Sequence, residues 1–307
     1  MGRDQPANVA ASVRQRLLNR ARHQKQDYQV LLTRYILERF LYRLSQSPHQ
    51  DRFVVKGAML FLLWEGEFHR TTRDLDLLAF GSSEIAPLEA TVREICTEAV
   101  EEDGVVFHPE TLRGRAIRED QIYDGVRVTV EAHLGSAHLS LQIDVGFGDT
   151  IIPAPKKEAF PVLLDFPAPT LPVYPKETVV AEKFQAMVEL GITNSRMKDF
   201  YDLWYLSNHF AFDGSTLVRA ITATFERRGT PPPSERPLAL TDAFAEDPTK
   251  QRQWRAFLNR GGLKTNAGTL REVIEVLNDF LWPPTSAVAT ERPFEAAWQP
   301  PGPWRDA

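Results

Sequence analysis

The sequence predicts an α+β protein, in which a lobe of helices and strands is followed by a mostly helical C-terminal lobe. Three observations support this prediction. Apolar residues at every fourth position mark one face of a helix near the N-terminus: Leu32, Ile36, Phe40 and Leu44. Residues 126–130 and 139–145 instead alternate between apolar and polar side chains, as half-buried strands do. Beyond residue 175 the pattern is helical.

The elements of the first lobe follow one another closely along the chain. Two helices are expected at the start, and the second of them carries the apolar face just described. A short apolar strand at residues 53–55 leads through a Lys-Gly pair into a helix over residues 58–64. A strand over residues 74–80 and an amphipathic helix over residues 84–102 come next, ahead of the two alternating strands.

Prolines mark the expected boundary between the lobes. Seven of them lie close together: Pro153, Pro155, Pro161, Pro167, Pro169, Pro172 and Pro175. Proline disfavours both a helix interior and a central strand, so a junction is expected here. The predicted organisation is a first lobe over residues 1–152, a Pro-rich junction over 153–175, a helical lobe over 176–285 and an irregular tail over 286–307.

Composition indicates a globular protein and excludes several classes of site. With 43% hydrophobic residues among 307, the chain has enough apolar side chains for the cores of two domains. Its single cysteine, Cys96, excludes an internal disulfide and a cysteine-based zinc site. The longest apolar run, residues 58–64, is far shorter than the roughly 20 residues that span a bilayer, and no signal-peptide pattern is present. We therefore expect a cytoplasmic protein that does not associate with membranes.

Positive charge is concentrated near the N-terminus. The net charge is −5, but residues 1–50 contain nine Arg or Lys against three acidic residues, which gives +6 there and −11 for the rest. Arg16 and Arg20 lie one helical turn apart and are candidates for contacts with RNA phosphates. The alternative, which is more common for a basic cluster taken alone, is a solvated helix face.

Three aspartates are the candidate metal ligands. Asp74 and Asp76 alternate with core leucines along their predicted strand, so both carboxylates point to one side. Asp144 lies on the polar face of a later strand, between Ile143 and Val145. Mg²⁺ prefers such oxygen ligands, and two ions about 4 Å apart can serve nucleotide transfer. The alternative for Asp-Leu-Asp alone is an exposed strand face with surface ion pairs.

Lys56-Gly57-Ala58 is the candidate phosphate-binding segment. A strand runs through the glycine into the N-terminus of a helix, whose free N–H groups attract phosphate. Taken alone, Lys56-Gly57 is merely a turn. Its position ahead of two carboxylates and of a further Asp-bearing strand favours a nucleoside triphosphate (NTP) site.

These motifs together resemble a known family. The residues that carry the resemblance are Lys56-Gly57-Ala58, Arg70-x-Thr72-x-Asp74-x-Asp76, Ile143-Asp144-Val145, Glu182-Lys183 and Arg196-x-Lys198-Asp199-x-Tyr201-Asp202-Leu203. They resemble the nucleotidyltransferase toxins of the AbiEii/AbiGii group over about residues 14–210. The resemblance implies a polymerase β-like nucleotidyltransferase lobe, with the helical lobe after it.

The resemblance also implies roles for individual residues. Asp74, Asp76 and Asp144 are expected to hold Mg²⁺. The expected catalytic set is completed by Lys183 and Asp199, while Asp202 is expected to be partly structural. The nucleotide-binding residues are expected to be Lys56, Gly57, Ala58, Arg70, Thr72 and Lys183. Ala58 stands where the group often has a second Gly or a Ser, so a hydroxyl contact to phosphate is lost there.

Spacing alone makes Lys183 unusual. On a helix, its neighbours at three and four positions are apolar: Val179, Val180, Ala186 and Met187. An ammonium group in such surroundings needs an anionic partner, and the family resemblance implies that this partner is a triphosphate. The alternative is a lysine whose stem covers the core while its charge reaches water.

The predicted function is that of a toxin from a toxin–antitoxin or phage-defence pair. The resemblance implies a Mg²⁺-dependent enzyme that adds nucleotides from NTP to an RNA acceptor, the 3′ end of tRNA, and a cognate winged-helix antitoxin encoded nearby. Two alternatives remain open. One is a nucleotidyltransferase that modifies a protein or a small molecule, and the other is a noncatalytic nucleic-acid-binding or partner-binding module.

Overall fold

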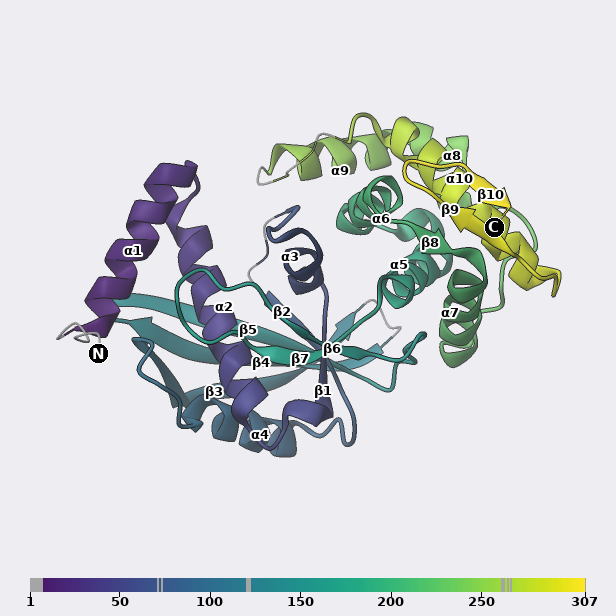
Figure 1. Cartoon of the computed structure of the whole chain (residues 1–307). Helices are drawn as coiled ribbons and strands as arrows, with labels where there is room; N and C mark the ends of the chain where they lie inside the picture. The colour runs from purple at the N-terminus through teal and green to yellow at the C-terminus, as the bar shows by residue number, and fades with distance from the viewer. Residues whose placement is uncertain are drawn as a thin grey trace. The chain divides into compact units, whose positions relative to one another are not determined.

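The computed structural model describes residues 8–70, 72, 74–119, 123–260, 263, 265 and 267–306. The chain divides into two compact units, and each is built from two stretches of sequence (Figure 1). Unit 1 comprises Met1–Gly148 with Lys156–Val173, and unit 2 comprises Asp149–Pro155 with Tyr174–Ala307. Both units mix helices and strands, as the α+β prediction requires.

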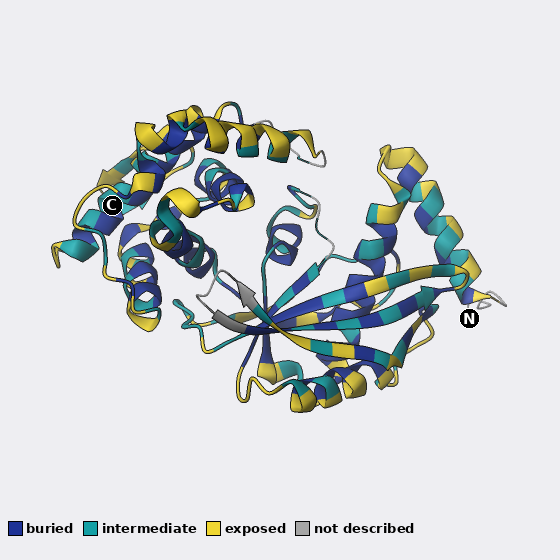
Figure 2. Ribbon diagram, turned by 180° about the vertical axis from the view of Figure 1, so that it is seen from behind, coloured by how far each residue is buried: buried dark blue, intermediate teal, exposed yellow. Residues whose placement is uncertain are grey.

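A seven-stranded sheet is the centre of unit 1. Its strands are β1 (Phe53–Lys56), β2 (Asp74–Ala79), β3 (Val105–Glu119), β4 (Tyr123–Leu134), β5 (Ala137–Phe147), β6 (Lys156–Ala159) and β7 (Thr170–Val173), in the order β3-β4-β5-β2-β1-β7-β6. The pairs β2–β5 and β1–β7 are parallel, and the others are antiparallel. Buried and more exposed residues alternate along β4 and β5 (Figure 2), as the sequence predicts.

The helices of unit 1 are α1 (Val9–Gln24), α2 (Tyr28–Gln46), α3 (Met59–Glu65) and α4 (Ile85–Thr97), with a 3-10 turn at Gln50–Arg52. The predicted apolar face of α2 is buried, and its four residues are at most 2% exposed: Leu32, Ile36, Phe40 and Leu44. Asp27 begins this helix, because its side chain accepts a hydrogen bond from Gln29 N at 2.6 Å. The two predicted N-terminal helices are therefore present.

Two charged side chains of α2 are buried because they find partners within unit 1. Arg39 donates to Glu38 Oε1 and to the carbonyl of Pro167, both at 2.9 Å. Glu38 Oε2 accepts from Leu163 N at 2.8 Å. A buried charge is tolerated only when such bonds replace water, so these contacts fasten the segment around residues 163–167 to α2.

Unit 2 is mainly helical. Its helices are α5 (Lys176–Leu190), α6 (Met197–His209), α7 (Gly214–Arg227), α8 (Asp242–Glu246), α9 (Pro248–Asn259) and α10 (Leu270–Ala289), with 3-10 turns at Gly191–Thr193 and Leu238–Leu240. A small sheet joins β8 (Phe212–Asp213), β9 (Ala296–Trp298) and β10 (Trp304–Asp306) in the order β10-β9-β8.

The segment predicted as a Pro-rich junction differs from that expectation. Residues 156–173 supply β6 and β7 to the sheet of unit 1, and Val173 of β7 pairs with Val55 of β1. Pro172 lies within β7 opposite Lys157. Proline cannot donate a hydrogen bond to a ladder and is rare inside sheets, which is why the proline run concealed these strands.

The predicted irregular tail also differs from the structure. α10 continues through Pro283 and Pro284 to Ala289, and two short strands follow it. Trp298 of β9 is 1% exposed and donates its indole N–H to Ser207 O at 2.6 Å, so tertiary contacts order the tail. A strand of three residues is too short to leave a recognisable period in the sequence.

β3 is a long edge strand that the sequence analysis did not predict. It contains Pro109, and its register with β4 shifts between His108 and Arg113. Such a bulge interrupts the alternation of side chains between the two faces, so the two-residue period is lost there. Within the part of the chain that the structure describes, no helix is both long and apolar enough to cross a membrane.

Candidate metal and nucleotide site

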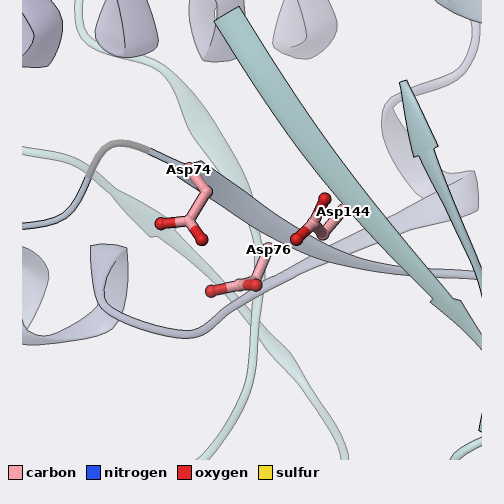
Figure 3. A group of neighbouring side chains, drawn as sticks. All are labelled: Asp74, Asp76 and Asp144. Atoms are coloured by element: carbon pink, nitrogen blue, oxygen red, sulfur yellow. The ribbon is translucent and has the colours of Figure 1, made fainter. Parts of the chain in front are cut away.

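The three predicted aspartates meet on two neighbouring strands of unit 1. β2 and β5 run parallel, with Asp76 opposite Asp144 and Asp74 opposite Gln142. One carboxylate oxygen of each aspartate lies within 4.8 Å of the others, and Figure 3 shows the three side chains extending to the same side of the strands. Asp144 is 8% exposed, and the other two are half-buried. We call Asp74, Asp76 and Asp144 the aspartate cluster.

The chemistry of the aspartate cluster fits a divalent ion. Its three groups are hard oxygen donors, which is the ligand type that Mg²⁺ and Mn²⁺ prefer. Neighbouring carboxylates repel one another, so a cation between them removes a cost that the protein otherwise bears. Asp74 and Asp76 are partly exposed, so water or phosphate can reach an ion that they hold. The residues present therefore suit Mg²⁺.

Gly57 lies against this cluster and is required there for two reasons. β1 pairs with β2 so that Lys56 is opposite Asp76, and Gly57 follows with a left-handed φ of 71°. A β-carbon at Gly57 would lie 1.9 Å from Asp76 Oδ2. The predicted Lys-Gly turn thus brings the backbone close to the carboxylate of Asp76, and only glycine permits that approach.

We expect Gly57→Ala to disturb the site more than the fold. The methyl group would displace the carboxylate of Asp76, and a shift of about 1 Å in a catalytic group can cost roughly 100-fold in rate. Gly66→Ala is the matched control, because Gly66 has a similar φ of 76° but nothing within 4 Å of its would-be β-carbon. Thermal melts should show similar losses for both variants, whereas enzymatic activity should fall only for Gly57→Ala. Equal activity in the two variants would contradict this expectation.

The other predicted nucleotide-binding residues of unit 1 lie next to Gly57 or in the segment before β2. Thr72 Oγ1 donates to Asp74 Oδ1 at 2.7 Å, so Thr72 orients a carboxylate of the site. Arg70 is half-buried in the segment that precedes β2. Ala58 is 3% exposed and precedes the first residue of α3. Whether these residues bind a nucleotide stays a prediction.

Arg127 is a functional candidate that the sequence analysis missed. Its Nε and Nη2 atoms donate to Asp144 Oδ1 and Oδ2 at 2.7 and 2.6 Å, which is a two-pronged ion pair. β4 and β5 place the two residues directly opposite each other. The signal was present in the alternation itself, because Arg127 lies between the buried Val126 and Val128 and must face the polar side.

The predicted residues of unit 2 form a compact network of charges, which we call the lysine network. Lys183 Nζ lies 2.6 Å from Asp199 Oδ1 and 2.9 Å from Asp202 Oδ2. Arg196 Nε donates to Asp199 Oδ2 at 2.7 Å. The side chains of both aspartates are 1% exposed. The protein itself therefore supplies anionic partners to Lys183, and a triphosphate contact by this lysine stays a prediction.

The ionisation of Asp199 follows from these contacts. Burial alone raises the pKa of a carboxyl group, but here the charges of Lys183 and Arg196 outweigh burial and hold the pKa of Asp199 below its usual value. Asp199 is thus a carboxylate with both oxygens engaged. Asp202 shares the lysine partner of Asp199, and Asp199 also accepts from Arg196, while the contrast between an active Asp199 and a partly structural Asp202 stays a prediction.

The two arginines predicted to contact RNA both make contacts within unit 1. Arg16 pairs with Asp165 at 2.9 Å, and Arg20 Nη1 donates to the carbonyl of Leu163 at 2.6 Å. The side chain of Arg16 remains 40% exposed. Both arginines therefore help to hold the segment around residues 163–165 as well as presenting charge to solvent. Contact with RNA stays a prediction.

Comparisons with known proteins identify a family. The sequence profile described as "Nucleotidyl transferase AbiEii toxin, Type IV TA system" matches residues 39–283. A solved structure of a candidate nucleotidyltransferase from Helicobacter pylori is similar, with a TM-score of 0.47 and 14% identity, over 86% of this chain and 95% of that chain. The solved structure of JHP933 from the same organism has a TM-score of 0.46 and 15% identity, over 86% and 92%. Curated proteins gave no match.

Proposed function

Because this chain belongs to the AbiEii family of nucleotidyltransferase toxins, we propose that it uses Mg²⁺ and NTP to add nucleotides to the 3′ end of tRNA. The family makes the chain a nucleotidyltransferase and the toxin of a type IV toxin–antitoxin pair. An antitoxin partner and an NTP substrate follow from that membership. The metal, the RNA acceptor and the type of antitoxin are our proposal.

The observation that supports the proposal most is the aspartate cluster. Its carboxylate oxygens lie within 4.8 Å of one another on two parallel strands, and Gly57 allows the backbone to approach them. Bound Mg²⁺ would neutralise phosphate charge and favour ionisation of the acceptor hydroxyl. Asp74, Asp76 and Asp144 are the proposed metal ligands, and Asp144 is also proposed to contact the acceptor hydroxyl or to accept its proton.

Lys56, Gly57 and Ala58 are proposed to bind the triphosphate. Lys56 lies opposite Asp76 in the β1–β2 pair, so its side chain shares a face of the sheet with that carboxylate. Its ammonium group suits phosphate as a point charge, while the backbone N–H groups of the following turn are further donors. Lys183 and Asp199 are proposed as the remaining catalytic residues, on the family resemblance alone.

A labelling experiment tests the acceptor. Purified protein is incubated with total RNA and each labelled NTP in turn, with and without Mg²⁺, and the products are separated on a denaturing gel. We expect label in the tRNA band with Mg²⁺ and with the preferred NTP. Label in protein or in a small molecule would overturn the RNA acceptor but not the transferase. The absence of divalent-dependent NTP binding would favour a noncatalytic module. A winged-helix antitoxin, expressed from the neighbouring gene, should suppress the labelling.

The basic N-terminal segment is proposed to guide RNA, and salt dependence tests this. Arg16→Glu with Arg20→Glu should weaken RNA binding and leave NTP binding unchanged. For each lost phosphate contact, the slope of log K against log salt should fall by about 0.7 to 0.9. RNA affinity is measured by filter binding across a salt series. Equal affinity and equal slope in variant and parent would restore the solvated-face alternative.

Two controls are needed for this double variant. Arg219→Glu with Arg252→Glu makes the same change in net charge at exposed positions of α7 and α9. The loss of the Arg20 contact to Leu163 also requires a thermal melt, so that a drop in RNA affinity is not attributed to unfolding. Only a salt slope that changes in the N-terminal variant, and not in the control, supports RNA contact.

A further inference from the structure

We propose that Arg127 is a built-in counter-ion of the aspartate cluster, which competes with divalent metal for Asp144 and so lowers the metal affinity of the free protein. This inference rests on the metal centre proposed above. It concerns which residue neutralises the charge of Asp144 in the protein without bound metal. It assigns a role to a residue on β4 that lies outside the motifs of the sequence analysis.

The first argument is the geometry of the pair. Arg127 contacts both oxygens of Asp144, at 2.7 and 2.6 Å, with the parallel donors that only an arginine offers. The arrangement is fixed by the backbone, because Arg127 and Asp144 are direct partners in the β4–β5 ladder. The amide of Gln142, two residues before Asp144 on the same face, lies within 3.3 Å of the pair in either orientation of its end group.

The second argument is burial. The Asp144 side chain is only 9% exposed, so water cannot replace the hydrogen bonds that Arg127 gives. The Arg127 side chain is 23% exposed, which leaves its guanidinium partly in contact with solvent. A buried carboxylate such as that of Asp144 needs a charged or hydrogen-bonding partner both with and without bound metal. Arg127 is that partner when metal is absent.

The third argument is charge. Asp74, Asp76 and Asp144 carry three negative charges within a few ångströms, and Arg127 reduces that sum by one. A divalent ion that binds Asp144 must therefore either approach a guanidinium or take the carboxylate from it. Both outcomes weaken metal binding, since like charges repel strongly away from bulk water. The same residue thus stabilises the metal-free site and disfavours its occupation.

This role predicts changes of opposite sign in one variant. Arg127→Gln should lower the melting temperature of the metal-free protein, because Asp144 loses its charged partner. The same variant should bind Mn²⁺, in the absence of nucleotide, about tenfold more tightly than the parent, because a full positive charge beside the ligand is removed. A residue that only supports the fold would give a lower melting temperature with unchanged or weaker metal binding.

The chain offers a matched control. Arg115 of β3 is exposed and lies directly opposite Arg127 in the β3–β4 pair, one strand farther from Asp144. Arg115→Gln removes the same charge without touching the ion pair. We expect Arg115→Gln to leave both the melting temperature and the Mn²⁺ affinity close to those of the parent.

The experiment is a Mn²⁺ titration of the full-length protein by calorimetry, accompanied by thermal melts. Tighter binding in Arg127→Gln, but not in Arg115→Gln, supports the inference, and Arg127→Lys, which keeps a charge without the two-pronged contact, should fall between parent and Gln variant. If Arg127→Gln fails to fold, a parental affinity in Arg127→Lys overturns the inference. In an Asp144→Asn background, Arg127→Lys should no longer change the affinity.

Failure of this inference and failure of the proposed function look different. Measurable and equal Mn²⁺ affinity in parent and Arg127→Gln would overturn the counter-ion role and leave the metal centre standing. If neither the parent nor either Arg127 variant binds Mn²⁺, with or without NTP, both the counter-ion role and the proposed metal centre are overturned. Binding by Arg127→Gln alone would support the counter-ion role most directly.

Discussion

Asp76→Ala is expected to fold normally and to lose nucleotide transfer by at least about a thousandfold. The loss of one proposed metal ligand should raise the barrier by several kcal/mol, and about 4 kcal/mol corresponds to that factor. Asp76 sits between Gly57 and Asp144, so its carboxylate is central to the cluster. Its removal from a crowded anionic site relieves repulsion, so stability should change little.

Growth inhibition in cells and labelling of RNA in vitro are the two measurements. Asp279→Ala is the matched control, because Asp279 is an exposed aspartate of α10 and its loss should leave both readouts at parental levels. A thermal melt establishes that the Asp76 variant is folded. If a stably expressed Asp76→Ala protein still inhibits growth fully, catalysis at this cluster is not the cause of toxicity.

Lys183→Met is expected to lower the free energy of unfolding by about 3 to 5 kcal/mol, because it leaves two buried carboxylates without their shared ammonium partner. Lys198→Met is the matched control. Lys198 is exposed on the same helix as Asp199, so its replacement should change stability by no more than about 0.5 kcal/mol. Urea unfolding of both variants measures the difference.

A second substitution distinguishes a charge effect from lost packing. Asp202→Asn in the Lys183→Met background removes one of the two carboxylate charges that have lost the lysine, so it should restore part of the lost stability. A further loss would contradict this explanation.

The stability of the lysine network should also depend on pH, which urea unfolding at a series of acidic pH values measures. The pKa of Asp199 is lowered in the folded state, so its contribution is present above the unfolded pKa of about 3.9 and is lost as the pH falls through the folded pKa.

The aspartate cluster could be predicted because its signal is local. Alternation along β2 fixes the face of Asp74 and Asp76, and the flanking Ile143 and Val145 fix that of Asp144. The order of the motifs along the chain, with Gly57 before Asp74 and Asp76 and with Asp144 on a later strand, then indicated that they form one site. Which strands are neighbours is a non-local property, however. The position of β5 between β2 and β4 brings Arg127 to Asp144, and no pattern within either strand announces that order.

Lys183 shows a different limit of the sequence. Its apolar helical neighbours correctly indicated that the ammonium group needs an anion. They could not indicate whether the anion is a substrate or part of the protein, because Asp199 and Asp202 lie on another helix, α6. A buried charge has the same local signature in either case. Only the arrangement of α5 and α6 shows that two carboxylates already contact it.

The interleaving of the two units has a consequence for how the protein is made. All three aspartates have been synthesised once the ribosome passes residue 144. β7 (Thr170–Val173), which pairs with β1, is synthesised only later. At about 5 to 20 residues per second, roughly 1 to 6 seconds pass between the synthesis of Asp144 and that of Val173, and the edge of β1 is open throughout that interval. During that interval the buried pair on α2 also lacks its partners at Leu163 and Pro167. A fragment cut at residue 152 would be left permanently in this unfinished state.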